Sequence, residues 1–192
     1  MGRKSLPPAS NSAVLFPTPV VLVTCIDEVG KPNIITLALA GGVNLEPPMV
    51  GISIRPSRYS YECIKRSKEF VVNVPSEEMA RGADVCGILS GRETDKFALM
   101  GWKPVPGKVV KAPLIDQSPA QMECRVKQII PLGSHDLFIG EIVALHVKEE
   151  FLKENGQMDV TKIRPLAYCP SIREYWSLGK PLARFGFTKG KP

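Results

Sequence analysis

The sequence predicts a mostly β protein, an antiparallel β-barrel with short α-helices at its edge. Apolar stretches rich in β-branched residues alternate with short polar turns, as strands joined by hairpins require. The 192 residues include 18 prolines and 16 glycines, which favour many turns. Only two segments longer than one turn have a helical pattern, so the helices are expected to flank the sheet rather than to build the core.

The first two strands are expected to form a hairpin. Residues 19–26 are an apolar, β-branched run, and residues 27–33 contain a glycine and a proline, which is typical of a turn. Residues 33–40 are apolar at odd and even positions alike, so this returning strand is expected to be buried on both faces. Gly41 and Gly42 are expected to break or bend it.

Further strands are expected over residues 49–54, 70–74, 120–126 and 137–147. In the third of these, small or apolar residues alternate with polar ones. The alternation predicts a half-solvated antiparallel strand that turns Gln121, Glu123 and Arg125 towards water.

Two helices and a helical turn are expected between these strands. Residues 60–67 place apolar and charged side chains on opposite faces. Ser76 is a good N-cap, and the two glutamates that follow it suit the first turn of a helix ending near Leu89. Residues 97–100 are expected to form a short turn.

The chain is expected to form a single domain over residues 1–192, with a flexible lead-in over residues 1–13 and a tail over residues 180–192. The tail region is aromatic, so it is expected to pack on its own subunit or on a partner. No apolar stretch reaches membrane-spanning length, and no signal peptide is evident, which predicts a cytoplasmic protein. The five cysteines form no C-x-x-C pair and are expected to be reduced and structural.

Residues 53–60 are the first candidate site, because a strand runs there into the start of a helix. Backbone N–H groups at a helix N-terminus attract anions, and two arginines and three serines add donors. A phosphate cradle and a solvent-exposed helix cap both fit this pattern. The polar loop over residues 90–97 could complete an anion site or be an ordinary surface loop. His135 lies in a turn, where a histidine can move a proton or be structural.

The sequence contains no Rossmann, P-loop or G-x-S-x-G motif, so those nucleotide and hydrolase sites are not supported. The order of several short segments, however, resembles the flavin reductase-like family of FMN-binding split barrels, and its flavoredoxin-like members in particular. The segments that carry the resemblance are residues 19–24, 33–40, 47–48, 53–60, 70–74, 90–91, 95–97, 133–141 and 165–168.

The resemblance implies a split-barrel homodimer that holds FMN near the subunit interface and exchanges electrons with NADH, NADPH or a protein donor and with a small-molecule or protein acceptor. It implies His135 as the catalytic residue facing the flavin ring and no metal. The cofactor-binding residues that it implies are Thr36, Leu37, Ala38, Ser53, Ile54, Arg55, Arg58, Tyr59, Ser60, Ser90, Lys96 and Phe97.

Two other functions are considered beside a flavin-dependent oxidoreductase. One is a non-catalytic FMN carrier, which would bind flavin but oxidise NADH or NADPH poorly. The other is a basic β-barrel that binds nucleic acid, because the net charge is +6. Scattered basic residues and aromatic residues concentrated in the tail disfavour the nucleic-acid function.

Overall fold

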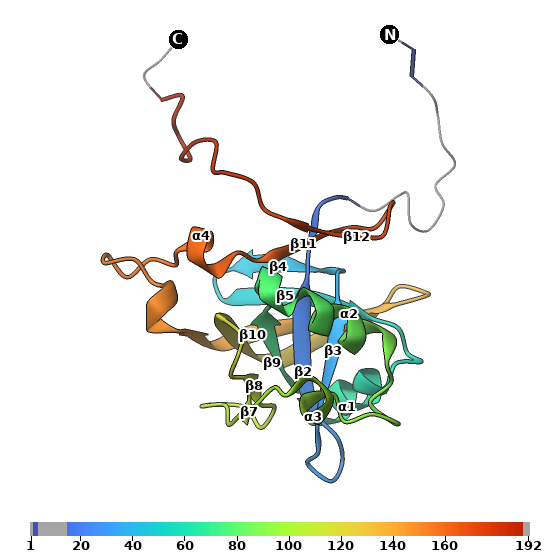
Figure 1. Ribbon diagram of the computed structural model, residues 1–192. Helices are drawn as coiled ribbons and strands as arrows, with labels where there is room; N and C mark the ends of the chain where they lie inside the picture. Colours follow the sequence, from blue (N-terminus) through green and yellow to red (C-terminus); the bar gives the residue numbers. More distant parts are fainter. Residues whose placement is uncertain (1, 4–14, 190–192) are drawn as a thin grey trace.

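The computed structural model describes residues 2–3 and 15–189, so most of the expected lead-in over residues 1–13 lies outside the described residues. Within them, the main sheet has seven strands in the order β3-β2-β6-β9-β10-β5-β4, and every neighbouring pair is antiparallel (Figure 1). It is the predicted split antiparallel barrel, with β3 and β4 as its edges. The strands are β2 (Val21–Ile26), β3 (Pro32–Leu37), β4 (Ala40–Leu45), β5 (Pro48–Ile54), β6 (Glu69–Val74), β9 (Ala120–Pro131) and β10 (Asp136–Val147).

A smaller sheet and four short α-helices flank this barrel. The smaller sheet has the order β1-β11-β12, and β7 pairs with β8 in a separate hairpin. These elements are β1 (Thr18–Pro19), α1 (Tyr59–Ser67), α2 (Ala80–Ile88), α3 (Lys96–Met100), β7 (Pro104–Val105), β8 (Leu114–Ile115), α4 (Val160–Ile163), β11 (Leu166–Cys169) and β12 (Glu174–Ser177), with 3₁₀ turns over Glu77–Met79 and Glu149–Phe151. None of the helices in the described part of the chain has the length and apolar character needed to cross a membrane.

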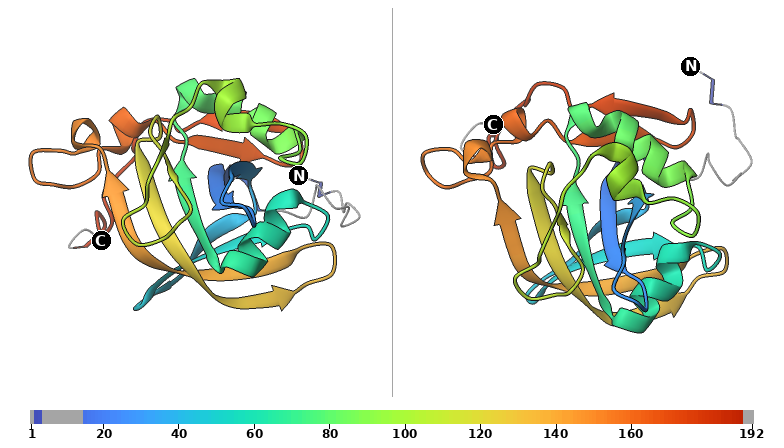
Figure 2. Two further views of the ribbon diagram at one scale, coloured as in Figure 1. Left: turned by 90° about the horizontal axis from the view of Figure 1, so that it is seen from below. Right: turned by 60° about the horizontal axis from the view of Figure 1, so that its bottom comes forward.

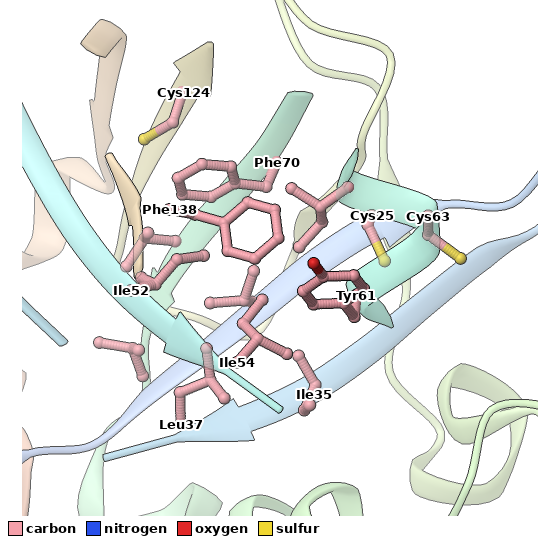
Figure 3. Close-up of a cluster of buried hydrophobic side chains, with 14 of the residues drawn as sticks. Cys25, Ile35, Leu37, Ile52, Ile54, Tyr61, Cys63, Phe70, Cys124 and Phe138 are labelled. Carbon is pink, nitrogen blue, oxygen red and sulfur yellow. The ribbon is translucent and has the colours of Figure 1, made fainter. Parts of the chain in front are cut away.

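The main core lies inside the curved sheet (Figure 3). Phe70 and Phe138 are completely buried there, and the rings of Tyr61 and Phe138 pack edge to face with their centroids 5.3 Å apart. Gly140 faces Phe70 across the core, and a Cβ at Gly140 would lie 2.5 Å from the Phe70 ring. Only glycine therefore lets β10 approach this ring.

A second core forms where α2 covers the opposite face of β2 and β3 (Figure 2). Strand β2 serves both cores, because Val21 and Val23 point into the barrel while Leu22 points towards α2. In β3, Ile35 points into the barrel and Ile34 points towards α2. The prediction that the second strand is buried on both faces is thus confirmed for its first half.

The extent of that second strand was predicted wrongly. Strand β3 ends at Leu37, and Ala40 already begins β4, which contains Gly41 and Gly42 instead of being broken by them. The Ser53 N–H donates to the carbonyl of Leu39 at 2.9 Å, which carries the chain across to pair with β5. A change of pairing partner therefore divides an apolar run that local sequence presents as continuous.

The prediction that the polar face of residues 120–126 is solvated is confirmed for the exposed Arg125 but is wrong for Gln121 and Glu123. Gln121 is 5% exposed and Glu123 is fully buried, because the segment between α3 and β9 covers this face. Glu123 accepts hydrogen bonds from the backbone N–H groups of Lys108, Val109 and Val110 at 2.7–2.8 Å, and its Oε1 lies 2.6 Å from His146 Nε2. One buried carboxylate thus fastens the covering segment to the barrel.

The predicted helices are present, with changes at the ends. Ser76 occupies an N-cap position, but its side chain makes no cap hydrogen bond, and a 3₁₀ turn precedes α2. The five cysteines are free, as predicted. In the tail region, Tyr175 packs on the second core, whereas Phe185 and Phe187 are exposed on the segment that runs away from the body after β12 (Figure 1).

Replacing Glu123 by Gln should destabilise the fold by roughly 2–4 kcal/mol, because an amide NH₂ leaves two buried backbone N–H groups without an acceptor. Burial by itself would raise the pKa of Glu123, but its hydrogen bonds from Val110, His146, Val109 and Lys108 outweigh burial and lower that pKa. The carboxylate is therefore charged at pH 7. Urea unfolding at pH 7 measures the effect.

Glu141→Gln is the matched control, because Glu141 pairs only with the half-exposed Lys127 on the barrel surface. It should change the free energy of unfolding by less than about 1 kcal/mol. Equal effects of the two substitutions would show that burial of Glu123 does not anchor the covering segment.

Candidate functional site

The turn between β5 and α1 presents two arginines at the start of a nine-residue helix. The backbone of Arg58 is extended at the N-cap position, and its side chain makes no cap hydrogen bond. Its N–H donates to the carbonyl of Arg55 at 2.9 Å, which closes the turn. Both arginines are exposed. The local structure therefore fixes the backbone and leaves both guanidinium groups available to a ligand.

A pocket of about 160 Å³ opens beside this turn, where the end of β3 meets the start of β10. It brings together seven of the residues expected to form the site, from segments far apart in the sequence. They are Thr36, Leu37, Ala38, Ser53, Arg55, Arg58 and His135, and Ile35, Leu39 and Gly87 complete the lining.

A second pocket of about 180 Å³ adjoins the first, because Ile35, Arg58 and Gly87 line both. It brings the start of α1 together with the loop before α3. Among the expected site residues it holds Arg58, Tyr59, Ser60, Ser90 and Lys96. The two pockets thus form one groove with an apolar wall from β3 at one end and hydroxyl and cationic groups at the other.

Lys96 is only 4% exposed, and it is among the residues that line the second pocket. It donates to the backbone carbonyls of Ile34 at 2.7 Å and Cys86 at 2.9 Å. No ion pair joins it to a carboxylate among the described residues, and burial lowers its pKa. An ammonium has three donors, so one remains for a ligand.

This wall is supported by Asn33, whose role sequence reasoning missed, and by two residues of the candidate loop over residues 90–97. Asn33 Nδ2 donates to Ser60 Oγ at 2.8 Å, and a Cβ on Gly91 would lie 2.1 Å from Asn33 Oδ1. Gly91 therefore lets the loop lie against Asn33. Arg92 also lines the pocket, with its guanidinium 5.4 Å from the centroid of the Tyr59 ring. In the sequence, a glycine within a polar loop is the one signal of the close contact between Gly91 and Asn33.

Ile54 and Phe97 line neither pocket. The side chain of Ile54 is fully buried inside the barrel, where Figure 3 shows it among the core residues. Phe97 is 4% exposed and packs in the second core under α2. Neither side chain is in place to contact a ligand in the groove, so their effect on the site is through the position of the backbone.

His135 is half-buried in the turn before β10 and lines the first pocket. Ser134 Oγ lies 2.9 Å from its Nδ1. The next residue, Asp136, is anchored in the core, where its Oδ2 accepts from the Tyr61 hydroxyl at 2.6 Å. Burial and the positive charge of Arg55 and, to a smaller extent, Arg58 lower the pKa of His135.

The charges along the groove have one sign. Arg55, Arg58, Arg92 and Lys96 line it, and no carboxylate is among the described residues of either lining. Guanidinium groups and hydroxyls suit a phosphate, while the β3 wall suits a flat apolar group. The fold and the groove thus define a split-barrel protein whose groove is cationic at one end and apolar at the other.

Comparison with known proteins identifies the family. Residues 13–177 match the model of the flavin reductase like domain. The chain therefore belongs to the flavin reductase-like family, whose members are flavin-related oxidoreductases.

Two solved structures are similar over nearly their whole length. Flavoredoxin of Desulfovibrio vulgaris (Miyazaki F) is 37% identical with a TM-score of 0.91, and the match covers 99% of this chain and 100% of that chain. Flavoredoxin from Methanosarcina acetivorans is 30% identical with a TM-score of 0.90, covering 98% of each chain. An uncharacterized protein of Archaeoglobus fulgidus is 35% identical over 76% of this chain and 80% of its own length.

The charges around His135 lead to a test that needs no ligand. Because its pKa is lowered, the imidazole should be neutral at pH 7 and should titrate below its ordinary value of 6.5 in an NMR titration. The unfolded chain would take up this proton first, so this residue's contribution to stability is lost as pH falls through its folded pKa. Arg55→Gln should raise the pKa of His135, whereas Arg66→Gln, which lies outside both pockets, should leave it unchanged. A midpoint above 6.5 would contradict the arrangement.

Proposed function

We propose that the chain binds FMN in the groove and acts as a flavin-dependent oxidoreductase that takes electrons from NADH, NADPH or a protein donor and passes them to a small-molecule or protein acceptor. The observation that carries the proposal is the cluster of cations without carboxylates, in which Lys96 is buried with a free donor. A doubly charged phosphate would complete this cluster. Similarity to two flavoredoxins over nearly the whole chain supports it.

The residues present fit this cofactor. Arg58, Ser60 and Lys96 would hold the phosphate end in the second pocket, with Tyr59 and Ser90 beside them. Arg55 and Ser53 would lie along the ribityl chain, and residues 36–38 would line the ring in the first pocket. The chemistry that bound FMN supplies is the uptake and release of electrons.

The chain's own contribution is to position the ligand and to hold a proton. A neutral imidazole at His135 can donate or accept one hydrogen bond at the edge of the first pocket. Asp136, bonded to Tyr61, keeps the His135 turn in place. Thr36 donates to the carbonyl of Ala83 at 2.5 Å, which holds α2 against the end of β3 and closes that side of the groove.

The proposal includes a homodimer and a cytoplasmic location. Strand β4 is an edge of the main sheet, and its Val43 and Leu45 are 49% and 88% exposed. An apolar hollow of about 620 Å³ lies beside this edge and shares Ala38, Leu39 and Ser53 with the groove. A second copy of the chain that covers this hollow would shelter the flavin ring of the bound FMN from water. Five free cysteines suit a reducing compartment.

Arg58→Ala should raise the Kd for FMN about tenfold, near 1.5 kcal/mol, the lower end of the range for a charged hydrogen bond because Arg58 is exposed. Fluorescence titration with FMN measures the change. Arg66→Ala, in the last turn of the same helix, is the matched control and should bind FMN like the unmodified protein. Unchanged affinity in Arg58→Ala would remove Arg58 from the phosphate site.

Anaerobic mixing of the FMN-loaded protein with NADH or NADPH should bleach the flavin absorbance in a stopped-flow experiment. His135→Ala should slow this reduction at least ~10-fold, as expected for loss of a residue that positions a proton, while changing the Kd for FMN less. Bleaching by neither nucleotide would exclude NADH and NADPH as donors and leave a protein donor or the non-catalytic FMN carrier. Equal rates with and without the imidazole would exclude His135 from the reaction.

Leu45→Glu should convert the protein to a monomer, because a charge in an apolar interface is buried without a partner. Sedimentation equilibrium should give the mass of two chains for the unmodified protein and of one chain for the variant. Val29→Glu, at the exposed hairpin tip between β2 and β3, is the control and should leave the mass unchanged. The mass of one chain for the unmodified protein would refute the dimer.

A further inference from the structure

A third pocket, of about 230 Å³, lies beside the first and has the opposite electrostatic character. Thr36, Ala38 and Gly87 form a wall common to both. The remaining lining comes from β11, β12, α2 and the start of β2, and consists of Val20, Asp84, Ile88, Tyr168 and Tyr175. Ligands in the third and the first pocket would therefore both contact these three residues.

Two tyrosines form one side of the third pocket. Tyr168 and Tyr175 are directly opposite each other on β11 and β12, and their ring centroids are 5.2 Å apart with the planes tilted by 53°. Both pack against the second core, so their rings are held in place. The face of an aromatic ring is electron-rich and attracts cations within about 6 Å of its centroid.

A carboxylate lies next to this pair. The Tyr175 hydroxyl donates to Asp84 Oδ1 over 3.4 Å. Burial and the neighbouring Asp84 raise the pKa of Tyr175 to about 12, so the hydroxyl stays a neutral donor at pH 7. This contact uses one of several acceptor positions on Asp84, because a carboxylate accepts about four hydrogen bonds or contacts. The remaining positions can face a ligand.

The contrast in charge between the neighbouring pockets identifies the ligand class. Asp84 is the one charged residue in the described lining of the third pocket, whereas the groove is lined by arginines and a lysine. Arg81, one turn earlier in α2, does not line the pocket. Aromatic faces with one carboxylate favour a weakly hydrated organic cation over an anion or an ammonium ion that water solvates strongly.

We propose that the third pocket binds an organic cation, a methylated ammonium or pyridinium group, against Tyr168 and Tyr175 and beside Asp84. Its role rests on the proposed function: the pocket would seat the cationic head of an electron acceptor next to the flavin ring. The class of substrate is thereby narrowed to molecules that carry such a group and no anion at the same position.

Choline and its uncharged isostere 3,3-dimethylbutan-1-ol separate charge recognition from apolar fit. Isothermal titration of the FMN-loaded protein should give choline an affinity about tenfold higher than that of the alcohol. Asp84→Asn should weaken choline binding only about threefold, because Asp84 is exposed, and should leave the affinity for the alcohol unchanged. Tyr175→Leu should weaken choline about tenfold. Asp116→Asn, an exposed aspartate outside the pocket, is the control and should change neither.

Equal affinities for the two probes in the unmodified protein would overturn the inference, and so would unchanged choline binding in both pocket variants. The FMN titration of the same samples reports separately on the proposed function. FMN uptake without a preference for choline refutes the third pocket alone. A preference for choline without FMN uptake supports the cation pocket and refutes the proposed role beside a flavin. If the protein both takes up FMN and prefers choline, choline should shift the flavin absorbance bands, because the third pocket shares a wall with the first.

Discussion

The site depends on one electrostatic constraint, which is that several cations converge on a groove whose described lining residues include no carboxylate. Lys96 is the extreme case, because its ammonium is buried and has only backbone carbonyls as partners. Such an arrangement is costly in an empty groove and favourable once an anion is bound. The fold carries this cost because the same lysine ties α3 to β3 and α2, so its structural role and its proposed ligand-binding role fall on one side chain.

The curved sheet sets the geometry of this groove. The chain leaves β3 at Leu37 and crosses to pair with β5, which places residues 36–38 beside the first pocket. Strand β5 then delivers Arg55 and Arg58 to the same pocket, and β10 delivers His135. Residues about a hundred positions apart thus meet because the strands that carry them are neighbours in one antiparallel sheet.

Much of the fold was predictable because apolar runs and turn residues are local signals. The cationic end of the groove was predictable as well, since Arg55 and Arg58 lie three positions apart at a helix start in the sequence. The burial of Glu123 was not predictable, because the irregular segment that precedes β9 folds back over this side chain. Ile54 and Phe97 belong to matching segments, yet their side chains point into the cores. The pocket formed by Asp84 and Tyr175 joins residues that only the tertiary fold brings together.

The two charge environments divide the region around the first pocket into a cationic part and an acidic, aromatic part. Arginines and Lys96 lie along the groove, while Asp84 and two tyrosines lie across the wall formed by Thr36, Ala38 and Gly87. This separation would let a phosphorylated cofactor stay bound while a reaction partner of the opposite charge arrives and leaves. It would also let this basic protein distinguish cationic from anionic ligands locally, which its net charge of +6 alone would not do.

The central claim is that the groove recognises a phosphate, and comparing FMN with riboflavin tests it most directly. The two molecules share the same ring and ribityl chain and differ only in the phosphoryl group. Equilibrium titration at fixed ionic strength should show FMN binding at least ~30-fold more tightly than riboflavin, as expected from the loss of one or two charged hydrogen bonds. Equal affinities for FMN and riboflavin would contradict the account.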